Sequence, residues 1–168
     1  MDLKKVFEFI EEKKGYKTPI RFKIVNNIPL NLGVHYKGTL ILNGYNIESL
    51  EDLKSVEKNL YLEYSSIKSL GNLESVGESL YLKNSEIQSL GNLEYVGRTL
   101  MLDNCKIQSL GNLKYVGHSL SLQNSEIQSF GNLKYVGGPL LLRNTPLSKK
   151  YTEEEIRQMI DVKGNIHL

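Results

Sequence analysis

The chain has 168 residues, 40% of them hydrophobic and 24% charged, and its formal net charge at pH 7 is +2. That length allows one domain with a substantial core, and the composition excludes a disordered chain or a strong polyelectrolyte, so charge alone indicates no partner. A single cysteine, Cys105, excludes an intramolecular disulfide, as is typical of proteins in a reducing compartment.

Residues 1–39 predict an N-terminal helix and cap. Apolar side chains recur at helical spacing over residues 3–14, namely at Leu3, Val6, Phe7 and Ile10. This segment is too short and too charged to span a membrane and lacks the cleavage site of a secretory signal, so we expect a cytoplasmic protein. Residues 20–39 predict an irregular first rung, with a strand at "RFKIV" and a junction at "HYKGTL".

From residue 40 onward the sequence repeats itself. Five rows of twenty residues run in one register from Leu40 to Pro139, and a sixth begins at Leu140 and then departs. Positions 1 and 3 of every row are leucine, which is the alternation of a short strand with one buried face. Positions 8, 11, 14 and 17 are also apolar, and a unit of this size cannot bury six such side chains alone. Successive rows must stack, which predicts a repeat solenoid: a parallel β coil with rungs about 4.8 Å apart.

Small residues mark the corners of this coil. Glycine recurs at positions 12 and 18 of the rows, where the chain must turn sharply, and we expect positive φ there. Position 5 is asparagine in four rows, and position 6 is serine, threonine or Cys105 in five. We interpret positions 5 and 6 as a ladder that satisfies backbone groups at the bend, with Cys105 as a member of it rather than a nucleophile.

The repeat resembles a known family. Rows such as "LYLKNSEIQSLGNLEYVGRT" resemble short leucine-rich repeats, and the junctions "SVGESLYL" and "YVGRTLML" resemble repeats of receptor L domains. Rows ending in "SLGNLxxVG" are also similar to proteins of unassigned function from bacteria and their phages. The resemblance covers about residues 40–148 and implies a leucine-rich-repeat-like fold and a binding role. The asparagine follows the second strand leucine by two residues instead of the family's three, so we expect a bend that differs in detail.

The C-terminal residues predict a second cap. "YTEEEIRQMI" predicts a helix with a capping box between Thr152 and Glu155, and with Ile156, Met159 and Ile160 turned toward the last rung. "VKGNIHL" resembles the junction between rows and predicts a final short strand. We therefore expect one continuous domain: an N-terminal helix and cap over 1–39, five to six repeats over 40–148, and a capping helix and strand over 149–168.

No pattern in the sequence predicts an enzyme, a metal site or a cofactor. His35, His118 and His167 fall far apart in the register, and "GNLKYVGG" lacks the ending of a phosphate-binding loop. A run of basic residues near the N-terminus is interpreted as a solvated surface, with contact to an anion as the alternative. These residues are Lys13, Lys14, Lys17, Arg21 and Lys23.

Positions 2 and 4 of the rows predict a binding surface. They point away from the core and differ from row to row, whereas nearly every other position is copied. Apolar anchors inside a polar rim are typical of protein-binding surfaces, although large side chains could also serve only to cover the sheet. The predicted partner-binding residues are Tyr61, Glu63, Tyr81, Lys83, Met101, Asp103, Gln123, Leu141 and Arg143.

Position 16 carries Tyr95, Tyr115 and Tyr135 in successive rows. We interpret them as stacked packing on another wall of the coil. The alternative is a regular aromatic ladder that holds an extended ligand such as a glycan.

Together these observations predict a non-enzymatic module that presents its diversified strand face to a protein partner. The similarity to phage proteins implies a host protein as partner, such as a defence component that is blocked on binding. Two alternatives stay open: a small-ligand or nucleotide binder that uses the basic N-terminal segment and tyrosines, and a self-assembling structural protein. Nucleic acid and membrane are not expected as partners.

Overall fold

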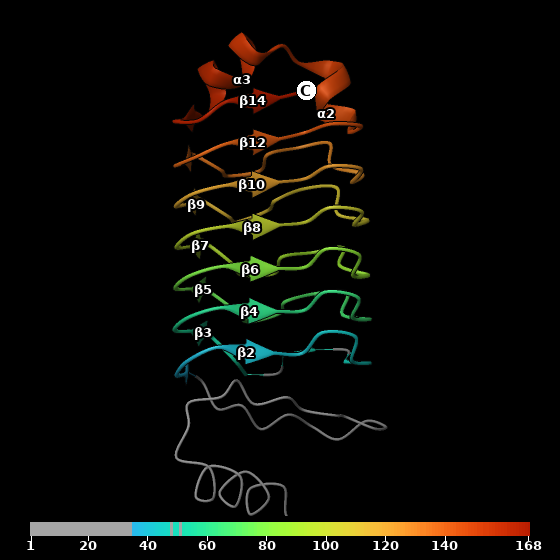
Figure 1. The fold of residues 1–168 in the computed structure, drawn as a ribbon, viewed down its shortest axis with the longest axis vertical. Helices are drawn as coiled ribbons and strands as arrows, with labels where there is room; N and C mark the ends of the chain where they lie inside the picture. Colours follow the sequence, from blue (N-terminus) through green and yellow to red (C-terminus); the bar gives the residue numbers. More distant parts are fainter. Residues whose placement is uncertain (1–34, 48, 51) are drawn as a thin grey trace, which may run out of the picture.

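The computed structural model describes residues 35–47, 49–50 and 52–168 as a parallel β-solenoid (Figure 1). The predicted helix over residues 3–14, the strand at "RFKIV" and the basic segment lie outside the described residues. The nucleotide-binding alternative depends on that basic segment, so the described residues do not test it. The predicted repeat solenoid is confirmed.

Within the described residues, the strands form two seven-stranded parallel sheets. The odd sheet contains β1 (His35–Tyr36), β3 (Ser55–Val56), β5 (Ser75–Val76), β7 (Tyr95–Val96), β9 (Tyr115–Val116), β11 (Tyr135–Val136) and β13 (Asp161–Val162). The even sheet contains β2 (Leu40–Ile41), β4 (Leu60–Tyr61), β6 (Leu80–Tyr81), β8 (Leu100–Met101), β10 (Leu120–Ser121), β12 (Leu140–Leu141) and β14 (Ile166–His167).

The register between the repeat strands is twenty residues. Leu60 lies between Leu40 and Leu80 in the even sheet, and each repeat strand pairs with its own copy one row away. His35 is opposite Ser55, so "HYKGTL" occupies the place of a row junction, as predicted. Each rung therefore rests on the rung before it.

The core is one continuous stack of the six apolar positions predicted from the repeat. Side chains at all six positions are buried in the five full rows, and the sixth row adds Leu140, Leu142, Leu147 and Ile156. Because each rung covers the one below, burial requires no second layer.

Polar side chains satisfy the backbone where the even strands end, as predicted. Ser65 Oγ donates to the carbonyl of Leu62 at 2.6 Å, and the hydroxyls of Ser125 and Thr145 make the same bond in their rows. Cys105 is buried in this ladder, its Sγ lies 3.1 Å from the carbonyl oxygen of Leu82, and burial raises the pKa of its thiol.

Asparagine at position 5 occupies the left-handed region of the backbone. The φ angles of the four asparagines lie between 57° and 60°, a conformation that asparagine tolerates better than most residues. Asn104 Nδ2 donates to Asn84 Oδ1 at 2.7 Å, and Asn144 donates to Asn124 in the same way at 2.9 Å. The amide ladder thus joins pairs of adjacent rungs at the corner.

Glycine is required at positions 12 and 18 of the rows for different main reasons. Position 12 has positive φ in four rows, as predicted, for example 57° at Gly91 and 55° at Gly111. At Gly91 and Gly131 a Cβ would also overlap the backbone of the rung below, whereas at Gly111 it would not. Position 18 was also expected to have positive φ, and this prediction is wrong, because the φ angle of Gly97 is not positive. A Cβ at Gly97 would instead overlap the carbonyl oxygen of Gly77 in the rung below. Close approach of successive rungs, rather than φ, therefore requires glycine at position 18.

Two helices close the C-terminal end. Helix α3 (Glu153–Met159) begins with the predicted capping box between Thr152 and Glu155, and buries Ile156. Helix α2 (Pro146–Lys150), which the sequence analysis did not predict, begins at the N-cap Thr145, whose side chain accepts from the backbone of Ser148. β13 and β14 then continue both sheets, which confirms the final short strand.

We predict that Gly97→Ala destabilises the protein by at least about 3 kcal/mol, because its Cβ would push against the backbone of the rung below. Gly111→Ala is the matched control, since a Cβ there meets no atom within 4 Å and the cost is that of the left-handed backbone alone, about 1–2 kcal/mol. Urea unfolding followed by circular dichroism measures both. Equal losses for the two variants would contradict the close approach.

Candidate protein-binding face

The outer face of the even sheet carries a line of apolar side chains. Position 2 places Ile41, Tyr61, Tyr81 and Met101 on four consecutive strands, each partly exposed. The strands lie one above the other (Figure 1). Ser121 interrupts the line on β10, and Leu141 resumes it on β12. The structure thus brings together the predicted apolar anchors Tyr61, Tyr81 and Met101 and separates Leu141 from them by one rung.

The two tyrosines of this face are stacked. The ring centroids of Tyr61 and Tyr81 are 4.6 Å apart, and the ring planes differ by 9°. Ile41 precedes the pair and Met101 follows it in the same line, so we expect the rings to be held in place before any partner arrives.

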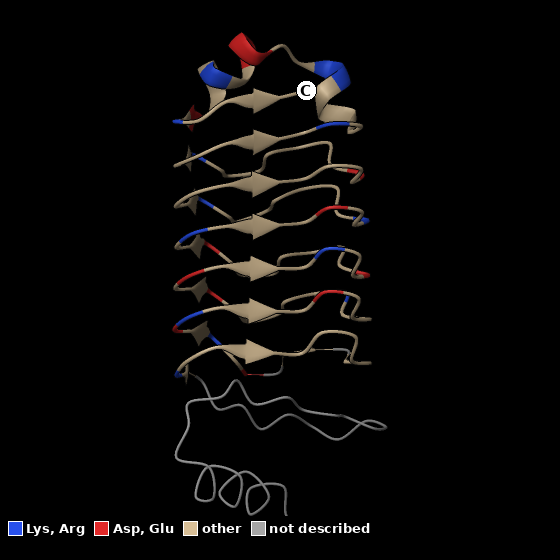
Figure 2. Ribbon diagram, viewed as in Figure 1, with Lys and Arg blue, Asp and Glu red and all other residues tan. Residues whose placement is uncertain are grey.

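Charged side chains border this line on the side where the strands end. Figure 2 shows acidic, basic, acidic and basic residues directly after β4, β6, β8 and β12, and these are Glu63, Lys83, Asp103 and Arg143. Glu63 and Lys83 are partly exposed and Arg143 is exposed. The face therefore offers both signs of charge beside one apolar line.

Asp103 has a second role that its place in the sequence did not reveal. It is only 7% exposed, and its Oδ1 accepts hydrogen bonds from the Ser121 hydroxyl and, at 3.0 Å, from the backbone N–H of Gln123. Asn43 Oδ1 likewise accepts a hydrogen bond from the backbone N–H of Glu63, at 2.9 Å. Asp103 thus fixes the rung above it, and little of its carboxylate remains for a partner.

The tyrosines of the odd sheet are also stacked. The centroid of Tyr115 lies 5.0 Å from that of Tyr95 and 4.9 Å from that of Tyr135, with interplanar angles of 5° and 6°. The ring faces that a sugar would stack on are largely covered by one another. This geometry favours the packing interpretation over an extended ligand.

Among the described residues, no three His, Cys, Asp or Glu side chains lie close enough together to hold a metal ion. The ring nitrogens of His35 and His118 lie 2.7 and 2.9 Å from the hydroxyls of Ser55 and Ser119. Among the described helices, none is long and apolar enough to cross a bilayer.

No family model, curated protein or solved structure matches this chain. The candidate site therefore rests on the geometry of its own residues.

The Tyr61 hydroxyl provides a probe of this face. Burial, followed by the charges of Tyr81, Glu63 and Glu78, raises the pKa of Tyr61 above its ordinary value of 10.0. We predict that Glu63→Gln lowers this pKa toward 10.0, because a repelling charge is removed, and that ultraviolet titration of the phenol detects the shift. An unchanged titration curve in Glu63→Gln would contradict the placement of the two side chains.

The raised pKa also predicts a pH dependence of stability. The unfolded chain releases the Tyr61 proton first, so this contribution is complete below pH 10.0 and is lost as the pH rises above it. In Tyr61→Phe, we expect a shallower loss of stability with rising pH in urea titrations above pH 10.0. Identical slopes for the wild type and Tyr61→Phe would contradict the shift.

For Asp103 we predict that Asp103→Asn is nearly neutral and that Asp103→Leu costs about 1–3 kcal/mol, because only asparagine keeps an acceptor for the buried Ser121 and Gln123 donors. Urea unfolding measures the difference. If both variants lost the same stability, the carboxylate charge and not its acceptor role would be required.

Proposed function

We propose that this chain is a non-enzymatic protein-binding module whose partner contacts the outer face of the even sheet. One observation carries the proposal: Ile41, Tyr61, Tyr81 and Met101 form an unbroken apolar line on adjacent strands, partly exposed and bordered by charge. Tyrosine and methionine are enriched where proteins bind one another, and a polar rim around an apolar centre is the usual arrangement.

The restricted mobility that stacking imposes on the two tyrosine rings supports this proposal. Binding costs less conformational entropy when the anchoring side chains are already fixed, and stacking restricts Tyr61 and Tyr81 in the free protein. An interface loses affinity when binding leaves a charge unpaired. Glu63 and Lys83 lie on adjacent rungs, so they would select a partner that places a basic residue opposite Glu63 and an acidic residue opposite Lys83.

The distribution of variation also supports a binding role. The inward positions repeat leucine, isoleucine and valine from row to row, whereas positions 2 and 4 change in nearly every row. This variation gives each part of the face a different set of side chains for contact with a partner. The resemblance of the row sequences to leucine-rich repeats and to proteins of bacteria and their phages extends the proposal to a cytoplasmic protein of phage or bacterial origin that blocks a host defence protein.

The test uses two matched pairs of substitutions. Tagged wild type, Tyr61→Ala/Tyr81→Ala and Tyr115→Ala/Tyr135→Ala would each be exposed to bacterial lysates with and without phage infection, and retained proteins identified by mass spectrometry. The second pair removes an equivalent stack, with centroids 4.9 Å apart, from the odd sheet. Purified partner would then be titrated against each variant by calorimetry.

We expect the Tyr61/Tyr81 pair to weaken binding by about 100-fold, as for loss of two interface anchors, and the Tyr115/Tyr135 pair to leave it within about threefold. The charge reversal Lys83→Glu should weaken binding by about tenfold. Thermal unfolding of each variant controls for loss of fold. A partner that binds all three proteins equally would contradict the proposed face.

A further inference from the structure

A second line of charge borders the even sheet on the side where its strands begin. Figure 2 shows basic, acidic and basic residues just before β4, β6 and β8, in the order opposite to that on the other side of the sheet. Lys58 and Arg98 are exposed, and Glu78 is partly exposed. We call Lys58, Glu78 and Arg98 the entry border, and Glu63, Lys83 and Asp103 the exit border.

Glu78 of the entry border lies against the even-sheet face. Its Oε2 accepts a hydrogen bond from Asn59 Nδ2 at 2.6 Å. Burial raises the pKa of Tyr61 above its ordinary value, and the charges of Tyr81, Glu63 and Glu78 add to this shift. Acidic groups of both borders therefore act on one ring of the apolar line, which lies between the two borders.

The two borders carry opposite charges on each of three successive rungs, and the sign reverses from one rung to the next. None of these side chains forms an ion pair within the described residues. Asp103 is mostly buried, so the rungs of β4 and β6 offer the most accessible charge. The opposed residues, one pair on each rung, are Lys58 with Glu63, Glu78 with Lys83, and Arg98 with Asp103.

This pattern of charge is complementary to itself. A two-fold axis parallel to the axis of the coil would place the faces of two copies against each other, with the entry border of one copy over the exit border of the other at the same rung. Lys58 would then meet Glu63 of the second copy, and Glu78 would meet Lys83 of the second copy, each twice. The apolar line would lie along the two-fold axis and pack against itself.

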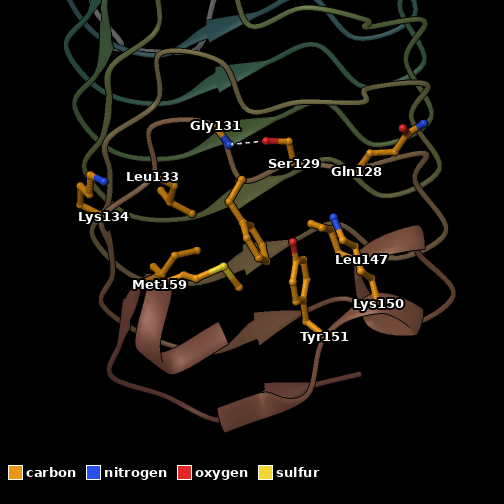
Figure 3. A pocket seen from close by; sticks show the side chains of 11 residues that line it. Gln128, Ser129, Gly131, Leu133, Lys134, Leu147, Lys150, Tyr151 and Met159 are labelled. Atoms are coloured by element: carbon orange, nitrogen blue, oxygen red, sulfur yellow. Dashed lines mark hydrogen bonds between the residues drawn. The ribbon is translucent and has the colours of Figure 1, made fainter. Parts of the chain in front are cut away.

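The C-terminal end of the described coil offers a second copy less than this face does. The carbonyls of Val162 and Gly164, which a further strand of the odd sheet would use, accept hydrogen bonds from Arg157 at 2.7 and 2.9 Å. Figure 3 shows the side chains that line a depression beside α2 and α3, where Leu133 and Leu147 are only 2% and 1% exposed. Contact between even-sheet faces is therefore favoured over contact through this end.

We infer that the even-sheet face binds a second copy of this chain, with the two-fold axis parallel to the coil. This inference rests on the proposed binding face and concerns its regulation, because a second copy that covers the apolar line competes with any other partner. An apolar line of four side chains is small for an interface, so we expect a weak dimer with a dissociation constant of about 10–100 µM.

The test is sedimentation velocity of the purified full chain over about a hundredfold range of concentration, across which the wild type should change from monomer to dimer. Glu78→Lys and Lys83→Glu each place two pairs of like charges opposite each other, so each should weaken the dimer by at least about tenfold. The double variant Glu78→Lys/Lys83→Glu restores opposite charges at both places. It should dimerise within about threefold of the wild type.

Two control variants change the net charge without altering either border. Glu86 and Lys106 are exposed and lie at position 7 of successive rows, away from positions 2 and 4. Glu86→Lys and Lys106→Glu should each leave the dimer within about twofold of the wild type. Thermal unfolding verifies that every variant keeps its fold.

Mixing two variants tests the orientation of the copies. An equimolar mixture of Glu78→Lys and Lys83→Glu should form a mixed dimer of nearly wild-type strength, because the two introduced charges face each other and the two original ones do likewise. An antiparallel pairing about β4 and β6 would instead place Glu78 opposite Lys58 and Glu63 opposite Lys83. The mixture would then keep two contacts between like charges and would not recover.

A wild type that stays monomeric, single reversals that weaken the dimer no more than their controls, or no recovery in the double variant and the mixture would each overturn the inference. A monomeric wild type would leave the proposed function standing, because that experiment captures a different protein. A dimer of this kind with no captured partner would contradict only the proposed function.

Discussion

The hydrogen-bonded register between successive rungs is the constraint on which the rest of this structure depends. Leu80 N donates to the carbonyl of Thr99 and Leu100 N to that of Ser119, both at 2.9 Å, and Gly97 and Gly117 make the equivalent bonds in the odd sheet. Both sheets therefore impose the same period on each row. A slip of one residue would turn every inward leucine of a strand outward, so the row length cannot drift.

Stacking at one register places each side chain directly over its copy. Identical aromatic residues then form ladders, as on both sheets, because their ring spacing matches the spacing of the rungs. Identical charges would repel in the same arrangement. At the exposed position before the odd strands, opposite charges meet on two of the four neighbouring pairs. There Lys54 pairs with Glu74 at 3.2 Å and Lys114 with Glu94 at 2.8 Å.

The spacing of residue types in the sequence was sufficient to predict the rungs, the six core positions and the helix capped by Thr152, because burial and capping depend on residue type at fixed spacing. It was not sufficient for features that depend on contact between rungs. Glycine recurs equally at positions 12 and 18, yet only the structure separates a positive φ at Gly111 from a close approach at Gly97. The burial of Asp103 depends on Ser121 in the next rung, and helix α2 on the local cap at Thr145.

In a solenoid, the inward residues determine stability, while the outward residues can serve in binding. Each rung contacts mainly its neighbours, so stability is close to a sum of local terms, and a change on one outer face has little effect several rungs away. The inward leucines and the glycine of position 18 fix the coil, which leaves outward residues such as Tyr81 and Lys83 free to change without refolding the chain. The cap is under a different restriction, because α2 and α3 must cover the last rung with residues outside the repeat.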